Sequence, residues 1–150
     1  MKQLRSAEEV FPLLHGCCGT YRLEGRIGFS RFTTEQLRYY TERSADDFVR
    51  SHAPAGICLE CTTDIPEISF TYRVWKEKGF YRTQSGFDIW ENGVLTAGFP
   101  LDLTGNETEI RYTRRQKEPS VIRITFPGGV IVLPDQFSLG NAVPTEQKPE

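Results

Sequence analysis

The sequence predicts an all-β fold, a sandwich or barrel, with one or two short helices near its N-terminus. Two observations lead to this fold class. From Gly56 onward, apolar and polar residues alternate with a period of two, and Gly or Pro turns interrupt the alternation at regular intervals. Short strands separated by turn residues in this way are typical of a sandwich or barrel and not of alternating β and α units. At 150 residues, the chain has about the length of one domain with a sizeable core.

Helical candidates are confined to the part of the chain before Gly56. Ser6-Ala-Glu-Glu places an acid three residues after a hydroxyl, which is a capping box, and predicts one or two helical turns that Pro12 keeps short. A second candidate runs from Thr34 to Tyr40. A third begins at Ser44, where Asp46 and Asp47 suit the positive end of the helix dipole. A strand is expected over residues 21–32, ahead of the last two candidates.

The remaining elements are expected to be strands. The clearest is Glu67 to Trp75, where four apolar residues recur on one face. Asn92-Gly93 is the strongest hairpin signal, because both residues tolerate the positive φ of a type I′ turn. The expected strands cover residues 57–63, 67–75, an element entered at 80–82, 86–90, 94–101, 109–113, 121–126 and 130–133. The sandwich is expected to span residues 1–140, and the polar tail 141–150 to be a linker.

Charge and composition exclude several classes of partner. The net charge is −2 and the pI is near 5.8, which gives no electrostatic case for nucleic acid. Acidic residues flank the basic stretch 111–117. No apolar run resembles a signal peptide or approaches the roughly 18 residues of a membrane span. We therefore expect a soluble, cytoplasmic chain without a membrane partner, whose four cysteines are reduced thiols.

The cysteines have two interpretations. Cys17-Cys18 with Cys58 and Cys61, and with His15 nearby, has the residue types of a zinc site. However, Cys58 and Cys61 are predicted to lie within one strand, where an odd separation directs them to opposite faces. The sequence favours small buried side chains, so neither a metal nor a cofactor is expected.

Nucleophilic catalysis requires a base beside a Ser or Cys, and the sequence contains only two histidines. His15 with Cys17 or Cys18 has no identifiable orienting residue. His52, at a predicted helix end, is expected to be a surface or helix-capping residue. No Gly-x-Ser-x-Gly elbow is present, so no catalytic residue is expected in this chain.

The most informative stretch is Ser85 to Gly93, where an acid stands between large apolar residues directly before the Asn-Gly turn. Alternation predicts Phe87 and Ile89 on one face and Asp88 and Trp90 on the other. Asp88 is either a ligand-binding acid or a hydrogen-bonded structural acid that ties the strand to a loop. The second interpretation is favoured, because buried polar groups are normally paired.

Aromatic residues cluster around this stretch. Trp75 and Tyr81 are candidates for stacking against a sugar, and Trp90 lies next to Asp88. Exposed aromatic surface usually marks an interaction site. The alternative for each ring is a place in the core, where aromatic side chains contribute much of the buried area.

Gly86-Phe-Asp-Ile-Trp resembles the Gly-x-Asp-Leu-Tyr motif that names a β-sandwich domain found at the N-terminus of certain SGNH/GDSL-type esterases. Ile89 and Trp90 replace Leu and Tyr with residues of similar shape. Further resemblances follow in the same order as in that family and cover roughly residues 28–133. They are Gly28-Phe-Ser-Arg-Phe, Ser51 to Ile57, Thr63-Asp-Ile-Pro-Glu-Ile and Pro127-Gly-Gly-Val. The resemblance does not account for the cysteines.

The resemblance implies a jelly-roll-like sandwich that packs on an SGNH hydrolase domain and shapes the cleft for its carbohydrate or acyl-ester substrate. That C-terminal domain carries the Ser, His and Asp of the triad, and none of its motifs occurs here. Residues 141–150 would lead toward it. Under this interpretation Asp88 holds the motif loop, Gly86 permits a close backbone approach and Trp90 lies at the domain interface. The alternative function is a free-standing carbohydrate-binding module.

Overall fold

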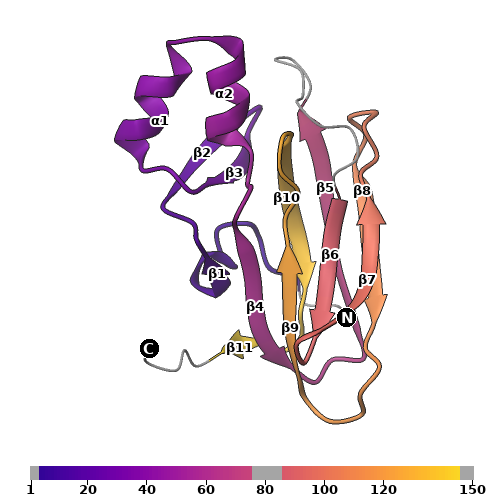
Figure 1. The fold of residues 1–150 in the computed structure, drawn as a ribbon. Helices are drawn as coiled ribbons and strands as arrows, with labels where there is room; N and C mark the ends of the chain where they lie inside the picture. Colours follow the sequence, from indigo (N-terminus) through magenta and orange to yellow (C-terminus); the bar gives the residue numbers. More distant parts are fainter. Residues whose placement is uncertain (1–3, 76–85, 146–150) are drawn as a thin grey trace.

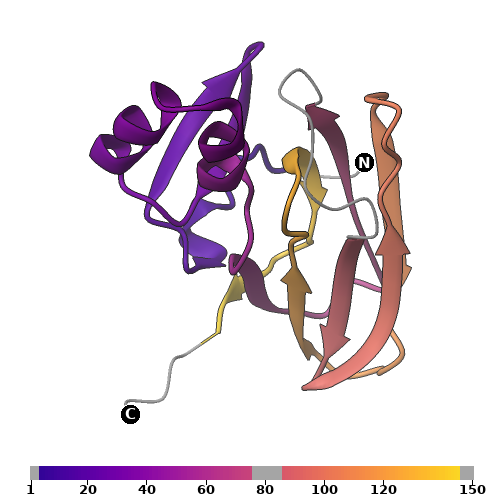
Figure 2. The same cartoon turned by 45° about the horizontal axis from the view of Figure 1, so that its top comes forward.

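The structure is a computed structural model that describes residues 4–75 and 86–145. Two antiparallel sheets pack face to face, and a pair of helices lies beside them with a separate β-hairpin (Figure 1). Figure 2 shows the helical pair and the hairpin on the same side of the sandwich. The predicted fold class, an all-β sandwich with short helices, is confirmed.

The larger sheet has six strands in the order β1-β4-β9-β6-β7, with β11 also paired to β4. Its strands are β1 Leu14–His15, β4 Cys58–Thr63, β6 Gly86–Glu91, β7 Val94–Pro100, β9 Ser120–Thr125 and β11 Val143–Pro144. The hairpin of β6 and β7 closes through Asn92 and Gly93, whose φ angles are 51° and 83°. The predicted turn at this position is therefore confirmed.

The smaller sheet has three strands in the order β10-β5-β8. Its strands are β5 Glu67–Trp75, β8 Thr108–Thr113 and β10 Ile131–Ser138. The chain passes from β9 in one sheet to β10 in the other through the turn that begins at Pro127. This crossing places the two inner faces against each other, as in other face-to-face sheet packings.

The sequence prediction of one strand over residues 21–32 is wrong, because this segment contains most of a two-stranded hairpin. Strands β2 Gly19–Leu23 and β3 Arg26–Ser30 pair in antiparallel register. Glu24 and Gly25, at φ angles of 51° and 80°, form the turn between them. Two successive positive φ angles match the right-handed twist of a hairpin. Gly25 was the signal in the sequence, but Glu24 does not belong to the usual Asn, Asp or Gly set.

The second and third helical candidates both form helices, one from its predicted first residue and the other from its predicted cap. Helix α1 Thr34–Thr41 starts at Thr33, whose side chain forms a capping box with Gln36. Helix α2 Ala45–His52 starts at Ser44, whose hydroxyl accepts a hydrogen bond from the backbone N–H of Asp47 at 3.0 Å. Among the residues that the structure describes, no helix is long and apolar enough to cross a membrane.

The first helical candidate forms only a short 3₁₀ segment, η1 Phe11–Leu13. Its capping box is present, since Ser6 N–H donates to Glu9 Oε1 at 3.0 Å and Glu9 N–H donates to Ser6 Oγ at 3.2 Å. Pro12 lacks a backbone donor and limits the segment after this turn.

The core fills the space between the two sheets. Phe70 packs against Phe87 and Phe137 with ring centroids 5.0 and 5.3 Å apart. A second cluster lies beneath α2 and consists of Phe48, Val49, Trp75, Ile131 and Leu133. The tail also joins the fold, because Ala142 is buried and β11 pairs with β4. The sandwich thus extends to Pro144, into the range 141–150 that was expected to be a linker.

Candidate functional site

Strand β6 divides the motif residues between two environments. Phe87 and Ile89 are fully buried on the inner face, whereas Asp88 is exposed and Trp90 is half-buried on the outer face. The predicted alternation of the four side chains is therefore confirmed. Asp88 and Trp90 thus belong to the outer face of the six-stranded sheet.

The outer face carries two rows of cross-strand neighbours. The first contains Glu60, Arg123, Trp90 and Leu95, on β4, β9, β6 and β7 in that order. We call these four residues the Trp90 row. The second contains His15, Cys58, Thr125, Asp88 and Gly98. Side chains directly opposite on adjacent strands contact one another, so each row is a continuous strip.

A shallow hollow lies along the Trp90 row. Its volume is about 290 Å³, and its lining consists of Glu60, Trp90, Gly93, Val121 and Arg123. Arg123 Nε donates to Glu60 Oε2 at 3.1 Å. Trp90 Nε1 is buried and finds no hydrogen-bond acceptor among the described residues. Leu95, which is 52% exposed, extends the apolar surface toward β7.

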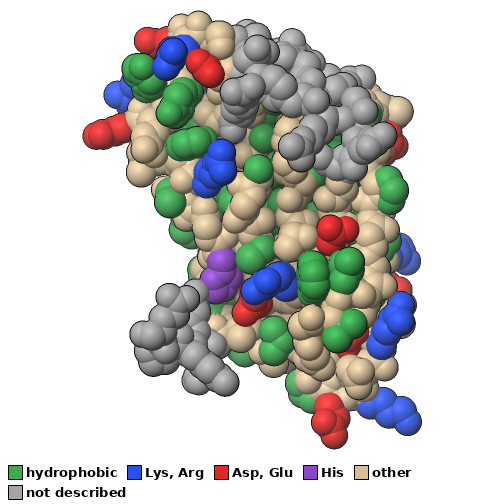
Figure 3. All heavy atoms as spheres, viewed as in Figure 1, with side chains coloured by type: hydrophobic (Ala, Val, Ile, Leu, Met, Phe, Trp, Pro, Cys, Tyr) green, Lys and Arg blue, Asp and Glu red, His purple; other side chains and the backbone are tan. Residues whose placement is uncertain are grey.

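Figure 3 looks toward the side of the molecule on which β4, β6 and β9 lie in front. Hydrophobic, acidic and basic side chains are interspersed over these strands, and a histidine lies at the margin. A core of apolar side chains with a charged rim is the usual composition of a protein–protein interface. Along the Trp90 row, the outer face combines apolar side chains with charged ones in this way.

Two glycines allow the motif strand to pair closely with β7. A Cβ built on Gly86 would lie 2.3 Å from the carbonyl oxygen of Phe99, a backbone atom that cannot move aside. A Cβ on Gly98 would lie 3.1 Å from Asp88 Oδ1, at the end of a side chain that can turn away. Gly86 is therefore required by the backbone, whereas Gly98 leaves room for the Asp88 carboxylate.

The hydrogen-bonded structural acid of this stretch is Glu91. Its carboxylate accepts hydrogen bonds from Tyr112 Oη at 2.6 Å and Ser120 Oγ at 2.7 Å. It also accepts from the backbone N–H groups of Arg115 at 2.9 Å and Gln116 at 3.2 Å. Burial opposes ionisation of Glu91, but these four bonds outweigh it and lower the pKa to about 2.

Glu91 therefore performs the task that the sequence interpretation gave to Asp88, since it ties the end of β6 to the segment after β8. Period-two alternation from Phe87 and Ile89 already placed Glu91 on the inner face. This alternation is the sequence signal that distinguishes Glu91 from Asp88. Asp88, exposed on the outer face, is available for contact with a partner.

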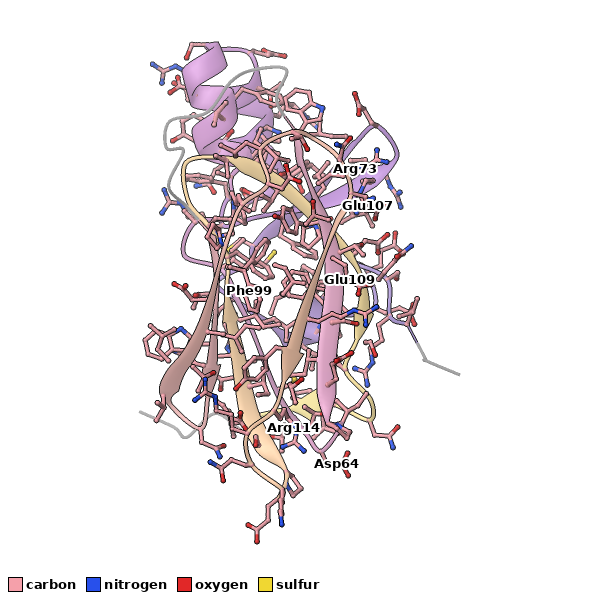
Figure 4. All side chains as sticks on the ribbon, turned by 90° about the vertical axis from the view of Figure 1, so that its right-hand side faces the viewer. Asp64, Arg73, Phe99, Glu107, Glu109 and Arg114 are labelled. Carbon is pink, nitrogen blue, oxygen red and sulfur yellow. The ribbon has the colours of Figure 1, made fainter. Side chains whose placement is uncertain are left out.

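Arg114 completes the buried polar network. Its guanidinium donates to the carbonyl oxygens of Ile65, Asp64 and Glu118 at 2.6, 2.7 and 2.8 Å. It also donates to Ser120 Oγ at 2.9 Å and lies 4.0 Å from Glu91 Oε2. Figure 4 shows Arg114 beside Asp64 at one end of the sandwich. Both buried charges are satisfied, as a stable buried pair requires.

Trp75, a predicted stacking residue, does not reach this surface. Trp75 is 9% exposed and packs against Phe48 at 5.4 Å between ring centroids, so it offers no open ring face for stacking. Tyr81 lies outside the described residues. Trp90 is the tryptophan that the outer face presents.

The prediction that the cysteines are small buried side chains holds for Cys61 and is wrong for Cys18, which is exposed, whereas Cys17 and Cys58 are half-buried. Cys58 lies on the outer face and Cys61 is fully buried on the inner one, which confirms the prediction from their odd separation. Burial raises the pKa of Cys61 to about 12. Burial also raises the pKa of Cys17, whose Sγ donates to the carbonyl oxygen of Gly19. Within residues 4–75 and 86–145, no group of three metal-ligating side chains comes together.

His52 is a helix-capping residue, and the surface alternative is wrong. Its ring is buried and stacks on Phe48 at 4.0 Å between centroids. Nδ1 lies 2.8 Å from the carbonyl oxygen of Phe48, in the last turn of α2. Burial lowers the pKa of His52, so the neutral ring suits this apolar position.

Comparison with known proteins identifies the fold. No protein-family model and no curated protein matches the sequence. Salicylyl-acyltransferase SsfX3 from a tetracycline biosynthetic pathway matches 99% of this chain with a TM-score of 0.75 and 15% identity. A GDSL-like lipase from Bacteroides ovatus matches 95% with a TM-score of 0.59 and 20% identity. The chain spans 42% of the length of each of these proteins.

Proposed function

We propose that the chain is a non-catalytic accessory domain of a GDSL-type esterase or acyltransferase. The observation that carries this proposal is the coverage of the structural matches. Nearly all of this chain superposes on SsfX3, yet the match accounts for only 42% of that enzyme. Under this proposal, the chain after Pro144 leads to a hydrolase domain.

The outer face of the six-stranded sheet is the proposed contact with the hydrolase domain. Trp90, Leu95 and Val121 supply its apolar part, and the ion pair of Glu60 and Arg123 supplies a charged rim. Such an arrangement excludes water from the centre of an interface and fixes orientation at its edge. From this position the domain shapes the cleft for an acyl or carbohydrate substrate.

The burial of Ser51 and His52 argues against a catalytic role for these two neighbouring residues. Ser51 Oγ lies 3.0 Å from His52 Nδ1, which superficially resembles a nucleophile–base pair. However, Ser51 is 1% exposed, and the same nitrogen lies 2.8 Å from the carbonyl oxygen of Phe48. A substrate carbonyl therefore has no access to this hydroxyl.

The test compares residues 1–150 with the polypeptide encoded by the open reading frame that continues past codon 150. Hydrolysis of p-nitrophenyl acetate is expected only from the longer polypeptide. In it, Leu95→Asp should separate the thermal unfolding of the two domains and lower kcat/KM, whereas Tyr39→Ser on helix α1 should do neither. Ester turnover by residues 1–150, or a stop codon at the end of this sequence, would refute the proposal.

A free-standing carbohydrate-binding module is the second candidate, and one observation favours it. Trp90 Nε1 has no acceptor among the described residues and belongs to the hollow that Glu60 and Arg123 line, where a sugar hydroxyl would be bound by polar groups. Titration with an oligosaccharide panel should then change tryptophan fluorescence in the wild type and not in Trp90→Phe. Buried Trp75 provides a constant background signal. No change with any glycan would remove this candidate.

A further inference from the structure

Strand β8 is an open edge of the smaller sheet. Among the residues that the structure describes, β8 pairs with β5 alone. It lies at the right-hand side of Figure 1, which is the side that Figure 4 turns toward the viewer. No loop within residues 4–75 or 86–145 exchanges main-chain hydrogen bonds with Glu109 or Arg111 of this strand. The edge therefore presents backbone donors and acceptors to a further strand.

The pairing of β8 with β5 determines which main-chain groups point to the open edge. Arg114 directly follows β8, and its N–H donates to the opposing carbonyl oxygen of Pro66 at 2.8 Å, so this pair is of the hydrogen-bonded type. Hydrogen-bonded and non-hydrogen-bonded pairs alternate along an antiparallel ladder. Ile110 therefore bonds to β5, whereas the N–H and C=O groups of Glu109 and Arg111 point away from it.

The same two residues carry opposite charges on the outer face of the smaller sheet. The side chains of Glu109 and Arg111 are 41% and 61% exposed. Arg111 Nε donates to Glu109 Oε1, and Arg111 Nη1 lies 3.9 Å from Glu67 Oε1. Ion pairs this exposed contribute little to stability and rearrange readily. Both charges are therefore available to a partner strand at little cost to the free chain.

The charge pattern of β8 is complementary to itself in one antiparallel register. Charged side chains on an edge usually keep two edges apart. When two copies of β8 pair with Ile110 opposite itself, however, Glu109 of each copy lies opposite Arg111 of the other. A shift of the register by two residues places either Glu109 or Arg111 opposite itself, and like charges in that position repel. A shift by one residue brings the outer face of one copy against the inner face of the other.

We propose that the chain forms a homodimer in which β8 pairs with β8 of a second copy about a two-fold axis, so that the two smaller sheets become one. In the register with Ile110 at the axis, the outward N–H and C=O groups of Glu109 meet those of Arg111 in the second copy. Backbone pairing and charge pairing thus select the same register. The contact uses the same surface of both copies, as a two-fold dimer requires. It leaves the outer face of the six-stranded sheet uncovered, so it is independent of the proposed function.

Sedimentation equilibrium of residues 1–150 measures the association. The mass should rise from 17.2 kDa toward twice that value as the protein concentration increases from the micromolar to the millimolar range. Hydrogen exchange followed by NMR then locates the contact. The amides of Glu109 and Arg111 should exchange more slowly at the higher concentration, whereas the amide of Ile110, bonded to β5, should be protected at both. A constant monomer mass, or slowed exchange confined to another edge, would overturn the proposal.

Charge reversal tests the register. Glu109→Arg and Arg111→Glu each place like charges opposite one another in the dimer, and each should weaken self-association about tenfold or more. When the two variants are mixed, every facing pair again has opposite signs, so a heterodimer about as tight as the wild-type dimer should form. Both positions are exposed, and circular dichroism spectra establish that the variants are folded. Reversals without effect, or variants that fail to associate when mixed, would contradict this register.

Discussion

Removal of the Glu91 carboxylate is expected to be among the most destabilising single changes in this protein. Glu91→Ala leaves four donors without their acceptor: Tyr112 Oη, Ser120 Oγ and the N–H groups of Arg115 and Gln116. It also leaves the buried guanidinium of Arg114 without its counter-charge at 4.0 Å. Breaking a buried pair of this kind costs about 3–5 kcal/mol.

The isosteric change Glu91→Gln gives a sharper measurement, because it leaves no cavity. One carbonyl oxygen remains as an acceptor, while the amide nitrogen faces donors that it cannot satisfy. We expect a loss of about 2–4 kcal/mol in the free energy of unfolding, measured by urea denaturation at pH 7. The matched control is Asp88→Asn on the same strand. Because this carboxylate is exposed, its replacement should change the free energy of unfolding by less than about 0.5 kcal/mol.

The pH dependence of this difference tests the charge directly. The pKa of Glu91 falls from 4.5 to about 2 on folding, so the unfolded chain binds the proton more tightly. The ionised carboxylate therefore contributes its stability above about pH 5, and the contribution disappears as the pH falls toward 2. A shift of this size corresponds to about 3 kcal/mol.

The difference in unfolding free energy between wild type and Glu91→Gln should accordingly shrink by about half or more between pH 6 and pH 2.5. The other carboxylates titrate in both proteins, so their contributions to the unfolding free energy cancel in the difference between wild type and variant. A difference that stays constant over this range would refute the assignment of Glu91 as an ionised, hydrogen-bonded group. Equal destabilisation by Glu91→Gln and Asp88→Asn would refute the division of roles between them.

Other substitutions test the local geometry. Gly86→Ala should cost about 2–3 kcal/mol in urea denaturation, because its Cβ meets the Phe99 carbonyl oxygen at 2.3 Å; Gly98→Ala, which meets only Asp88 Oδ1 at 3.1 Å, should cost about 1 kcal/mol or less. Equal losses would contradict this difference. Iodoacetamide should alkylate exposed Cys18 rapidly and leave buried Cys61 unmodified in the native protein, as measured by mass spectrometry. Rapid labelling of Cys61 would show that β4 opens locally.

The fold class was predictable because each signal for it is local. Alternation along Glu67 to Trp75 and the Asn92-Gly93 turn depend on neighbouring residues only. The turn at Glu24 between β2 and β3 was not predicted, because the local signal for it is weak. Glu is uncommon at a positive φ, and the alternation before and after it is that of one continuous strand. A local pattern is thus reliable where the turn residues are of the usual types, and it fails where a turn contains an unusual residue such as Glu24.

The polar network was not predictable from local patterns. Glu91 joins partners that lie 21 and 29 positions further along the chain, at Tyr112 and Ser120. Trp75 is buried by Phe48 of α2, an element outside the sheet that contains it. In both cases the contact depends on how separate elements pack, which neither the period nor the spacing of residues reveals.

The division of roles along β6 also bears on the proposed function. Gly86 and Glu91 maintain the hairpin, one through backbone approach and the other through four hydrogen bonds. Asp88 and Trp90 point to the opposite side and contribute little to the core. A substitution of exposed Asp88 should therefore leave the stability of residues 1–150 nearly unchanged. A loss confined to the longer polypeptide would then place the partner on the outer face, whereas an equal loss in both polypeptides would make Asp88 structural.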